Sequence, residues 1–268
     1  MKYKLGVIGL GVMGEAILTR FIESEKFDAK EVCVFDIDAE KIDKYKYKYG
    51  VVPAESVAEL VDRSERILFA VKPQHYKAIC DGIDFNALTT IYSIMAGVST
   101  TELRSAIRSD EVGVVRIMPN VPCKIGKGVC GMTFDNVSEK EQELAMSAFS
   151  ACGSVVVTDE TKFDAITSVS GSGPAYVYMF AQGMIQGGMN GGLTYEESKI
   201  LALDTLIGAA EIAKSTETPL DVLVDRVCSK GGTTIEAVKV YKDNNLTDII
   251  AEGVDACRKK SEILSRTI

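Results

Sequence analysis

A glycine motif near the N-terminus constrains the fold of this chain more than any other feature of its sequence. An apolar run, Lys4–Ile8, leads directly into three closely spaced glycines in a Gly-x-Gly-x-x-Gly pattern, and an amphipathic segment, Glu15–Ser24, follows. Glycines at this spacing allow a tight strand-to-helix turn, close approach of a pyrophosphate to the backbone, and close helix packing. The alternative is that they serve packing alone. The motif predicts a dinucleotide site at Gly9, Leu10, Gly11, Val12, Met13 and Gly14.

The pattern after this motif alternates between strand-like and helix-like segments for about 160 residues. The expected strands are Lys4–Ile8, Glu31–Phe35, Arg66–Val71, Thr90–Ile94, Val112–Ile117, Val129–Phe134 and Ser154–Val157. Amphipathic helical segments separate them, which favours an α/β fold: a Rossmann-like, doubly wound, mostly parallel sheet with helices on both faces.

Beyond residue 161 only helical patterns remain. A Thr194/Glu197 capping box opens a helix over Tyr195–Lys214, and a Thr233/Glu236 pair is expected to cap another that ends at Asp243. We therefore predict two domains, a dinucleotide-binding domain over residues 1–160 and an all-helical domain over 161–268.

Asp36 follows the second expected strand, 22 residues after Gly14. An acidic residue at this position can accept hydrogen bonds from the ribose 2′-hydroxyl of a dinucleotide, and its charge opposes a 2′-phosphate. The next residues add two acids and no arginine, which favours NADH over NADPH. Lys41 or Lys44 could still reach a phosphate if the loop turns that way, so both cofactors stay open.

Three further segments follow expected strands, where doubly wound sheets bind their ligands. Each alone could be an ordinary turn, but together they predict a cleft for the nicotinamide half of the cofactor. The candidate residues are Val71, Lys72 and Pro73 after one strand, Ala96 and Gly97 after the next, and Asn120 after a third.

A second glycine-rich loop lies in the helical half. Ser229-Lys230-Gly231-Gly232-Thr233-Thr234 connects two helical segments and opens the second. Backbone N–H groups and hydroxyls at a helix N-terminus can bind a small anion such as a carboxylate. An ordinary inter-helix turn with Thr233 as the N-cap is an equally good interpretation of the spacing alone.

Charge and residue counts exclude several other functions. The formal net charge is −8, which argues against nucleic acid or an anionic membrane as the main partner. The 7 cysteines form no Cys-x-x-Cys pair, and there is 1 histidine, His75. We therefore expect reduced thiols, no metal site, and no histidine-based nucleophile.

The stretch from Ala165 to Tyr195 contains no charged residue and is long enough to span a bilayer. Its glycines, Pro174 and interleaved polar residues make it too weakly apolar for lipid. We expect a helix that is buried by protein, with Gly183, Gly187 and Gly191 allowing another helix to approach closely, and we expect this helix to form a subunit contact.

Four motifs in order along the chain resemble the pyrroline-5-carboxylate reductase family. They are the Gly9–Gly14 turn, Val71-Lys72-Pro73-Gln74, Ser170-Gly171-Ser172-Gly173-Pro174-Ala175-Tyr176, and the stretch from Ser229 to Ala237. The resemblance covers essentially the whole chain. It implies a cytoplasmic oxidoreductase of proline biosynthesis that reduces 1-pyrroline-5-carboxylate to L-proline with NADPH or NADH, and a homodimer or a larger homo-oligomer built from dimers.

The same resemblance implies roles in the second loop. Thr234 is the catalytic candidate that contacts the imine nitrogen, and the substrate-binding residues are Ser229, Gly231, Gly232, Thr233 and Thr234. Two residues depart from the family pattern: Lys230 stands where proline is frequent, and Tyr241 where a smaller or unhydroxylated apolar residue is usual. The family often uses NADPH, whereas Asp36 favours NADH.

Two rival functions remain. β-Hydroxyacid dehydrogenases share the Gly-Leu-Gly-x-Met-Gly opening and an aspartate after the second strand, but they place a catalytic lysine on the helix that opens the second domain. Residues 165–195 contain no lysine. A non-catalytic dinucleotide-binding sensor would explain the first domain and would leave the Ser229–Thr234 loop without a task.

Overall fold

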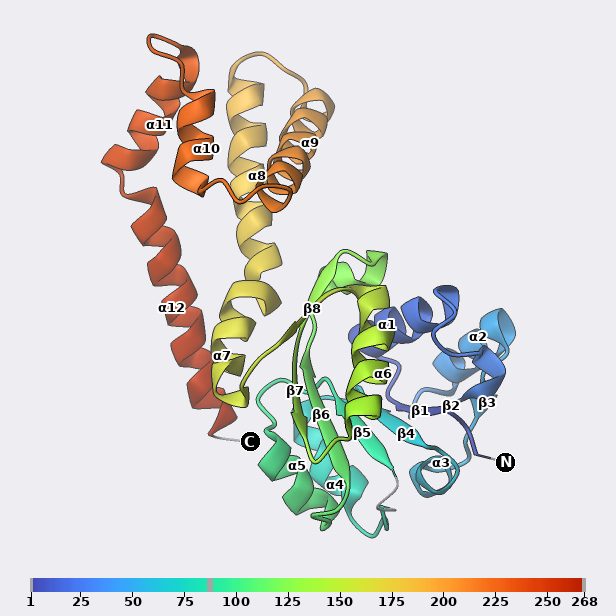
Figure 1. Cartoon of the computed structure of the whole chain (residues 1–268). Helices are drawn as coiled ribbons and strands as arrows, with labels where there is room; N and C mark the ends of the chain where they lie inside the picture. Colours follow the sequence, from blue (N-terminus) through green and yellow to red (C-terminus); the bar gives the residue numbers. More distant parts are fainter. Residues whose placement is uncertain (1, 86–88, 267–268) are drawn as a thin grey trace. The chain divides into compact units, whose positions relative to one another are not determined.

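The computed structural model describes residues 2–85 and 89–266, which divide into two compact units (Figure 1). Unit 1 comprises the residues up to Ser172 together with those from Cys257 on, and unit 2 comprises Gly173–Ala256. The chain therefore leaves unit 1 once and returns to it near its C-terminal end.

A single sheet forms the centre of unit 1. Among the described residues it has eight strands in the order β3-β2-β1-β4-β5-β6-β7-β8, and all neighbouring pairs are parallel except β6 and β7. The strands are β1 (Leu5–Ile8), β2 (Val32–Phe35), β3 (Val52–Pro53), β4 (Arg66–Phe69), β5 (Thr90–Ser93), β6 (Gly113–Met118), β7 (Gly128–Asp135) and β8 (Gly153–Val157).

Helices cover both faces of this sheet (Figure 1). One apolar cluster packs α1 (Val12–Glu23), α2 (Ala39–Tyr49) and α6 (Glu139–Phe149) on one face. A second cluster packs α3 (Val57–Asp62), α4 (Tyr76–Cys80) and α5 (Thr100–Ile107) on the other. The central strands are buried on both sides, so their sequences are nearly continuous apolar runs, interrupted in β6 by Arg116.

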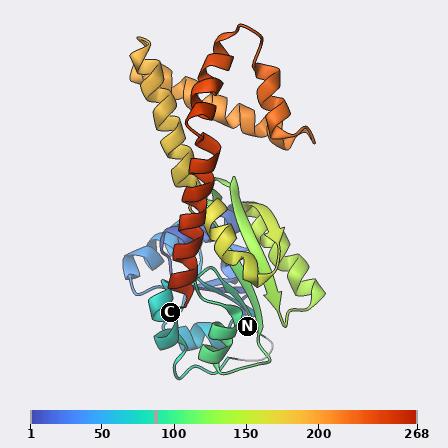
Figure 2. The same cartoon turned by 90° about the vertical axis from the view of Figure 1, so that its left-hand side faces the viewer.

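Unit 1 is completed by segments that follow the sheet. Helix α7 (Phe163–Ile166) runs into a π-helical turn over Thr167–Gly171, and the last part of α12 (Leu246–Ser265) lies beside it (Figure 2). The Ser261 hydroxyl donates a 2.6 Å hydrogen bond to Asp164, which fixes this end of α12 to α7.

Unit 2 consists of helices. They are α8 (Gly173–Asn190), α9 (Tyr195–Lys214), α10 (Leu220–Val227), α11 (Thr233–Asp243) and the first part of α12. Helices α8 and α9 pack side by side (Figure 1). The expected capping box at Thr194 and Glu197 is present in full and opens α9.

Unit 2 leaves most of its apolar side chains exposed. On α8 only Ala181 is buried, and Tyr178 and Met179 are 61% and 71% exposed. An apolar groove of about 900 Å³ runs between α8, α9, α11 and α12. No helix in the described part of the chain is long and apolar enough to cross a membrane.

The predicted fold class, a doubly wound Rossmann-like sheet followed by a helical domain, is confirmed. The sequence placed the domain boundary at residue 161, where the strands end. The compact units divide later, between Ser172 and Gly173, because α7 and the π-helical turn pack with unit 1.

One local expectation was wrong. Thr233 is the first residue of α11, whose N-cap is Gly232, and no side chain caps it. Within α8, the close approach occurs at Gly188, where an added Cβ would lie 2.7 Å from the Ser198 hydroxyl oxygen on α9. An added Cβ at Gly183 or Gly187 would meet no atom of this chain within 4 Å.

Candidate functional site

The glycine turn between β1 and α1 has the geometry that a pyrophosphate requires. Gly9 has φ +98°, and an added Cβ at Gly14 would lie 2.3 Å from the Gly9 carbonyl oxygen, so both positions need glycine for folding. A Cβ at Gly11 would meet no atom within 4 Å. Gly11 is also the N-cap of α1, without a side-chain cap. The open space and the uncapped N–H groups of the first turn fit a phosphate.

Asp36 lies directly after β2 and contacts this turn. One carboxylate oxygen accepts a hydrogen bond from Leu10 N at 2.5 Å, and the other accepts one from Asp38 N at 2.9 Å. Leu10 is fully buried, and its backbone N–H is already used in the bond to Asp36. Val12, by contrast, is 78% exposed at the start of α1. The structure thus places Asp36 and the glycine turn together.

The other candidates of the cofactor site follow β4, β5 and β6. Lys72 and Ala96 are exposed, and Val71, Pro73 and Gly97 are half-buried. Val71 lies against Gly9, because a Cβ added at Gly9 would be 3.0 Å from the Val71 side chain. These segments therefore share the carboxyl edge of the sheet with the glycine turn.

The Asn120 side chain binds neighbouring segments of the protein. Its Nδ2 donates to the Ser170 carbonyl at 3.0 Å, and its Oδ1 accepts from Val129 N at 2.9 Å. It is 9% exposed. Asn120 thus connects the end of β6 to β7 and to the π-helical turn. Any contact between Asn120 and a cofactor has to use the donor and acceptor positions that these two hydrogen bonds leave unused.

Sequence reasoning missed a cluster that fixes the loop after β5. Glu160 accepts 2.8 Å hydrogen bonds from Thr100 N, from the Thr100 hydroxyl and from Arg116 Nη1. The Arg116 guanidinium also lies 4.5 Å from the centre of the Phe163 ring. This cluster joins the start of α5, and with it the loop that carries Ala96 and Gly97, to β6 and α7. An arginine inside an otherwise apolar strand was the signal for it.

The substrate-loop candidates lie in unit 2. Gly231 has φ +74° and open space around its Cβ position, whereas an added Cβ at Gly232 would lie 2.4 Å from the Ser229 hydroxyl oxygen. Ser229 and Thr233 are exposed and Thr234 is half-buried. The loop presents the uncapped first turn of α11. The structure thus brings these five residues together, in a different compact unit from the glycine turn.

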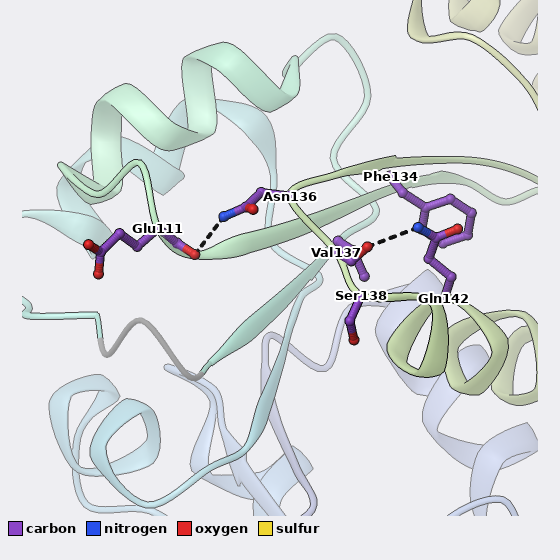
Figure 3. Close-up of a pocket in the computed structure, with 6 residues that line it drawn as sticks. All are labelled: Glu111, Phe134, Asn136, Val137, Ser138 and Gln142. Atoms are coloured by element: carbon purple, nitrogen blue, oxygen red, sulfur yellow. Dashed lines mark hydrogen bonds between the residues drawn. The ribbon is translucent and has the colours of Figure 1, made fainter.

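A hollow of about 500 Å³ lies at the opposite edge of the sheet, near the start of β6 (Figure 3). Asn136 Nδ2 donates to the Glu111 carbonyl at 2.8 Å, and Gln142 Nε2 donates to the Val137 carbonyl at 2.9 Å. Both amides are directed at backbone carbonyls of the hollow's own wall. This edge carries none of the predicted site residues.

Comparison with protein families gives two matches. The model described as pyrroline-5-carboxylate reductase dimerisation matches residues 160–264. The model described as NADP oxidoreductase, coenzyme F420-dependent, matches residues 4–97. The first covers the helical half together with α7, and the second covers the glycine turn, Asp36 and the segments after β4 and β5.

Individual proteins match over the whole chain. Pyrroline-5-carboxylate reductase from Synechocystis sp. is 35% identical and covers 99% of this chain and 100% of its own. The enzyme of that name from Aquifex aeolicus is 33% identical, with 98% of each chain covered.

Solved structures agree with these relatives. The pyrroline-5-carboxylate reductase from Coxiella burnetii superposes with a TM-score of 0.90 at 28% identity, covering 98% of this chain and 99% of its own. A Plasmodium falciparum pyrroline carboxylate reductase with NADP bound gives 0.88 at 28% identity, with 98% of each chain covered.

Proposed function

Because this chain belongs to the pyrroline-5-carboxylate reductase family, we propose that it reduces the C=N bond of 1-pyrroline-5-carboxylate to give L-proline, the last step of proline biosynthesis. Proteins named pyrroline-5-carboxylate reductase match this chain over nearly their full length, and this observation carries the proposal. Both glycine-rich loops, one in each compact unit, then have a task.

The dinucleotide-binding part of the mechanism belongs to unit 1. The uncapped first turn of α1 holds the pyrophosphate, and Gly11 leaves the space for it. Segments 71–73 and 96–97 line the nicotinamide half at the carboxyl edge of the sheet. The bound dinucleotide supplies the hydride that the imine carbon receives.

The substrate-binding part belongs to the Ser229–Thr234 loop. Backbone N–H groups of the first turn of α11, with the Ser229 and Thr233 hydroxyls, hold the substrate carboxylate. Gly231 and Gly232 bring that backbone close to the anion. The Thr234 hydroxyl hydrogen-bonds to the ring nitrogen and orients it. A substrate that arrives protonated needs no histidine acid, in agreement with a chain whose single histidine, His75, is exposed.

An assay of nicotinamide oxidation tests the function against its rivals. Turnover with 1-pyrroline-5-carboxylate, and none with β-hydroxyacids or without substrate, is the expected result. Turnover of a hydroxyacid would support a dehydrogenase, and dinucleotide binding without turnover of any substrate would support a sensor.

The Thr234→Ala variant tests the assigned role. We expect kcat/KM to fall by an amount equivalent to about 1–3 kcal/mol of transition-state stabilisation, the cost of one hydrogen bond to a polar or charged partner. Thr234→Ser keeps the hydroxyl and should recover most of the loss. Wild-type turnover by the alanine variant would refute the assignment.

The quaternary structure and location follow from the same proposal. The exposed apolar residues of α8 and the groove in unit 2 support a homodimer, or rings of dimers, in which a second copy covers them. Light scattering that shows a monomer at micromolar concentration would contradict this. All seven cysteines are free thiols, five of them buried, as is typical of a reducing compartment, which supports a cytoplasmic location.

A further inference from the structure

The carboxylate of Asp36 is held in one orientation at the edge of the glycine turn. Two backbone N–H groups fix it, Leu10 N on one oxygen and Asp38 N on the other. Because each carboxylate oxygen can accept two hydrogen bonds, both oxygens keep a free acceptor position. The side chain cannot rotate away from a bound ribose without breaking both bonds. It therefore presents a fixed negative charge and free acceptors where the adenosine ribose of a dinucleotide binds.

Neighbouring residues do not offset that charge. Ile37, the next residue, is 98% exposed and uncharged. Lys41 Nζ lies 3.9 Å from an oxygen of Asp38, and Lys44 Nζ lies 3.4 Å from an oxygen of Glu15. Each of these lysines thus already has a carboxylate partner.

The remaining lysines of α2 are farther away. Lys46 and Lys48 lie in its last turn, roughly 10 Å or more along the helix axis from its first residue. At physiological ionic strength, the Debye length of about 8 Å screens exposed charges at that separation. The segment from Asp36 to Gly50 contains no arginine that could pair with a phosphate.

We propose that Asp36 makes this protein select NADH and reject NADPH, by accepting hydrogen bonds from the ribose 2′-hydroxyl and repelling a 2′-phosphate. The inference rests on the proposed function only in its assumption that the cofactor serves this reaction. The choice between NADH and NADPH is itself a property of cofactor binding. Repulsion between a carboxylate and a phosphate a few ångströms apart corresponds to at least about a tenfold difference in dissociation constant.

Binding without substrate tests this directly. The wild-type chain is titrated with NADH and with NADPH while nicotinamide fluorescence is followed. Competition by 5′-AMP and by adenosine 2′,5′-bisphosphate then isolates the effect of the 2′-phosphate. We expect NADH to bind at least about tenfold more tightly than NADPH, and 5′-AMP at least about tenfold more tightly than adenosine 2′,5′-bisphosphate. Equal or tighter binding of NADPH would overturn the proposal.

Variants assign the effect to one side chain. Asp36→Asn removes the charge at constant size, and Asp36→Ser provides a second variant in case the first disturbs the turn; thermal unfolding confirms that each is folded. Both should reduce the NADPH-to-NADH ratio of dissociation constants about tenfold or more. Asp38→Asn removes an equal charge two residues away, retains an N-cap for α2, and should change the ratio by less than about threefold. An unchanged ratio in the folded Asp36 variants would refute the assignment.

The outcomes also separate this inference from the proposed function. A protein that selects NADH but does not reduce 1-pyrroline-5-carboxylate would contradict the function alone. A protein that reduces it and binds both cofactors equally would contradict the role of Asp36 alone.

Discussion

Replacing Glu160 with alanine should destabilise unit 1 substantially. The change removes three 2.8 Å hydrogen bonds and leaves the Arg116 side chain, which is only 10% exposed, without its carboxylate. Removing one partner of a fully buried ion pair costs about 3–5 kcal/mol. Glu160 is 28% exposed and the Phe163 ring still faces the guanidinium, so we expect a loss at the lower end of this range, about 3 kcal/mol.

Urea denaturation gives the free energy of unfolding of each variant, and thermal unfolding should show a decrease in Tm of roughly 6–12 °C. Glu160→Gln keeps an acceptor for Thr100 but loses the charge opposite Arg116, so its loss should be intermediate. An Arg116→Met/Glu160→Ala double variant should lose less than the sum of the two single variants, because no buried charge is left unpaired.

A neighbouring acid provides the control for Glu160. Asp159 pairs with Lys162, but these two side chains are 76% and 61% exposed, so Asp159→Ala should unfold at the wild-type midpoint. A Glu160→Ala protein within ~0.5 kcal/mol of wild type would refute the argument that this cluster fixes the loop after β5.

Three further changes test other parts of unit 1. Gly14→Ala should lower the unfolding midpoint strongly, because its Cβ would collide with a backbone oxygen. Gly11→Ala should lower the midpoint far less and should instead weaken NADH binding. Equal losses of stability in the two variants would contradict this. Tyr92→Phe removes a 2.6 Å hydrogen bond to Glu141, so urea denaturation should show a loss of about 1.5–3 kcal/mol, and no loss would refute its contribution. Burial raises the pKa of Cys80 to about 12, so maleimide at pH 8 should leave it unlabelled in the folded protein, as peptide mass spectrometry would show; rapid labelling would contradict this.

Much of unit 1 was predictable because its strands are apolar runs between glycines and polar turns. Strand β3 was missed, since Val52–Pro53 has two residues and no pattern of its own. The π-helical turn was also missed. It forms where the hydroxyls of Thr167, Ser168 and Ser170 bond to preceding carbonyls, and such back-bonding leaves no periodicity in the sequence.

The candidate site was predictable where a local motif specifies the backbone. The glycine turn and Asp36 belong to one short βαβ unit, so their proximity follows from spacing. The pairing of Lys44 with Glu15, by contrast, joins residues 29 positions apart on two helices, and only the packed structure shows it. The same applies to Glu160, whose partners Thr100 and Arg116 are distant in sequence.

The return of the chain to unit 1 determines the order in which the protein can be completed during synthesis. Unit 1 includes the residues from Cys257 on. The Cys257 thiol lies 3.2 Å from the Ser172 hydroxyl, and the Ser261 hydroxyl donates a hydrogen bond to Asp164. A ribosome therefore releases all of unit 2 before the final segment of unit 1 emerges. A premature stop codon shortly before Cys257 would leave helices α8 to α11 intact, cut α12 short, and deprive the dinucleotide-binding half of its closing segment.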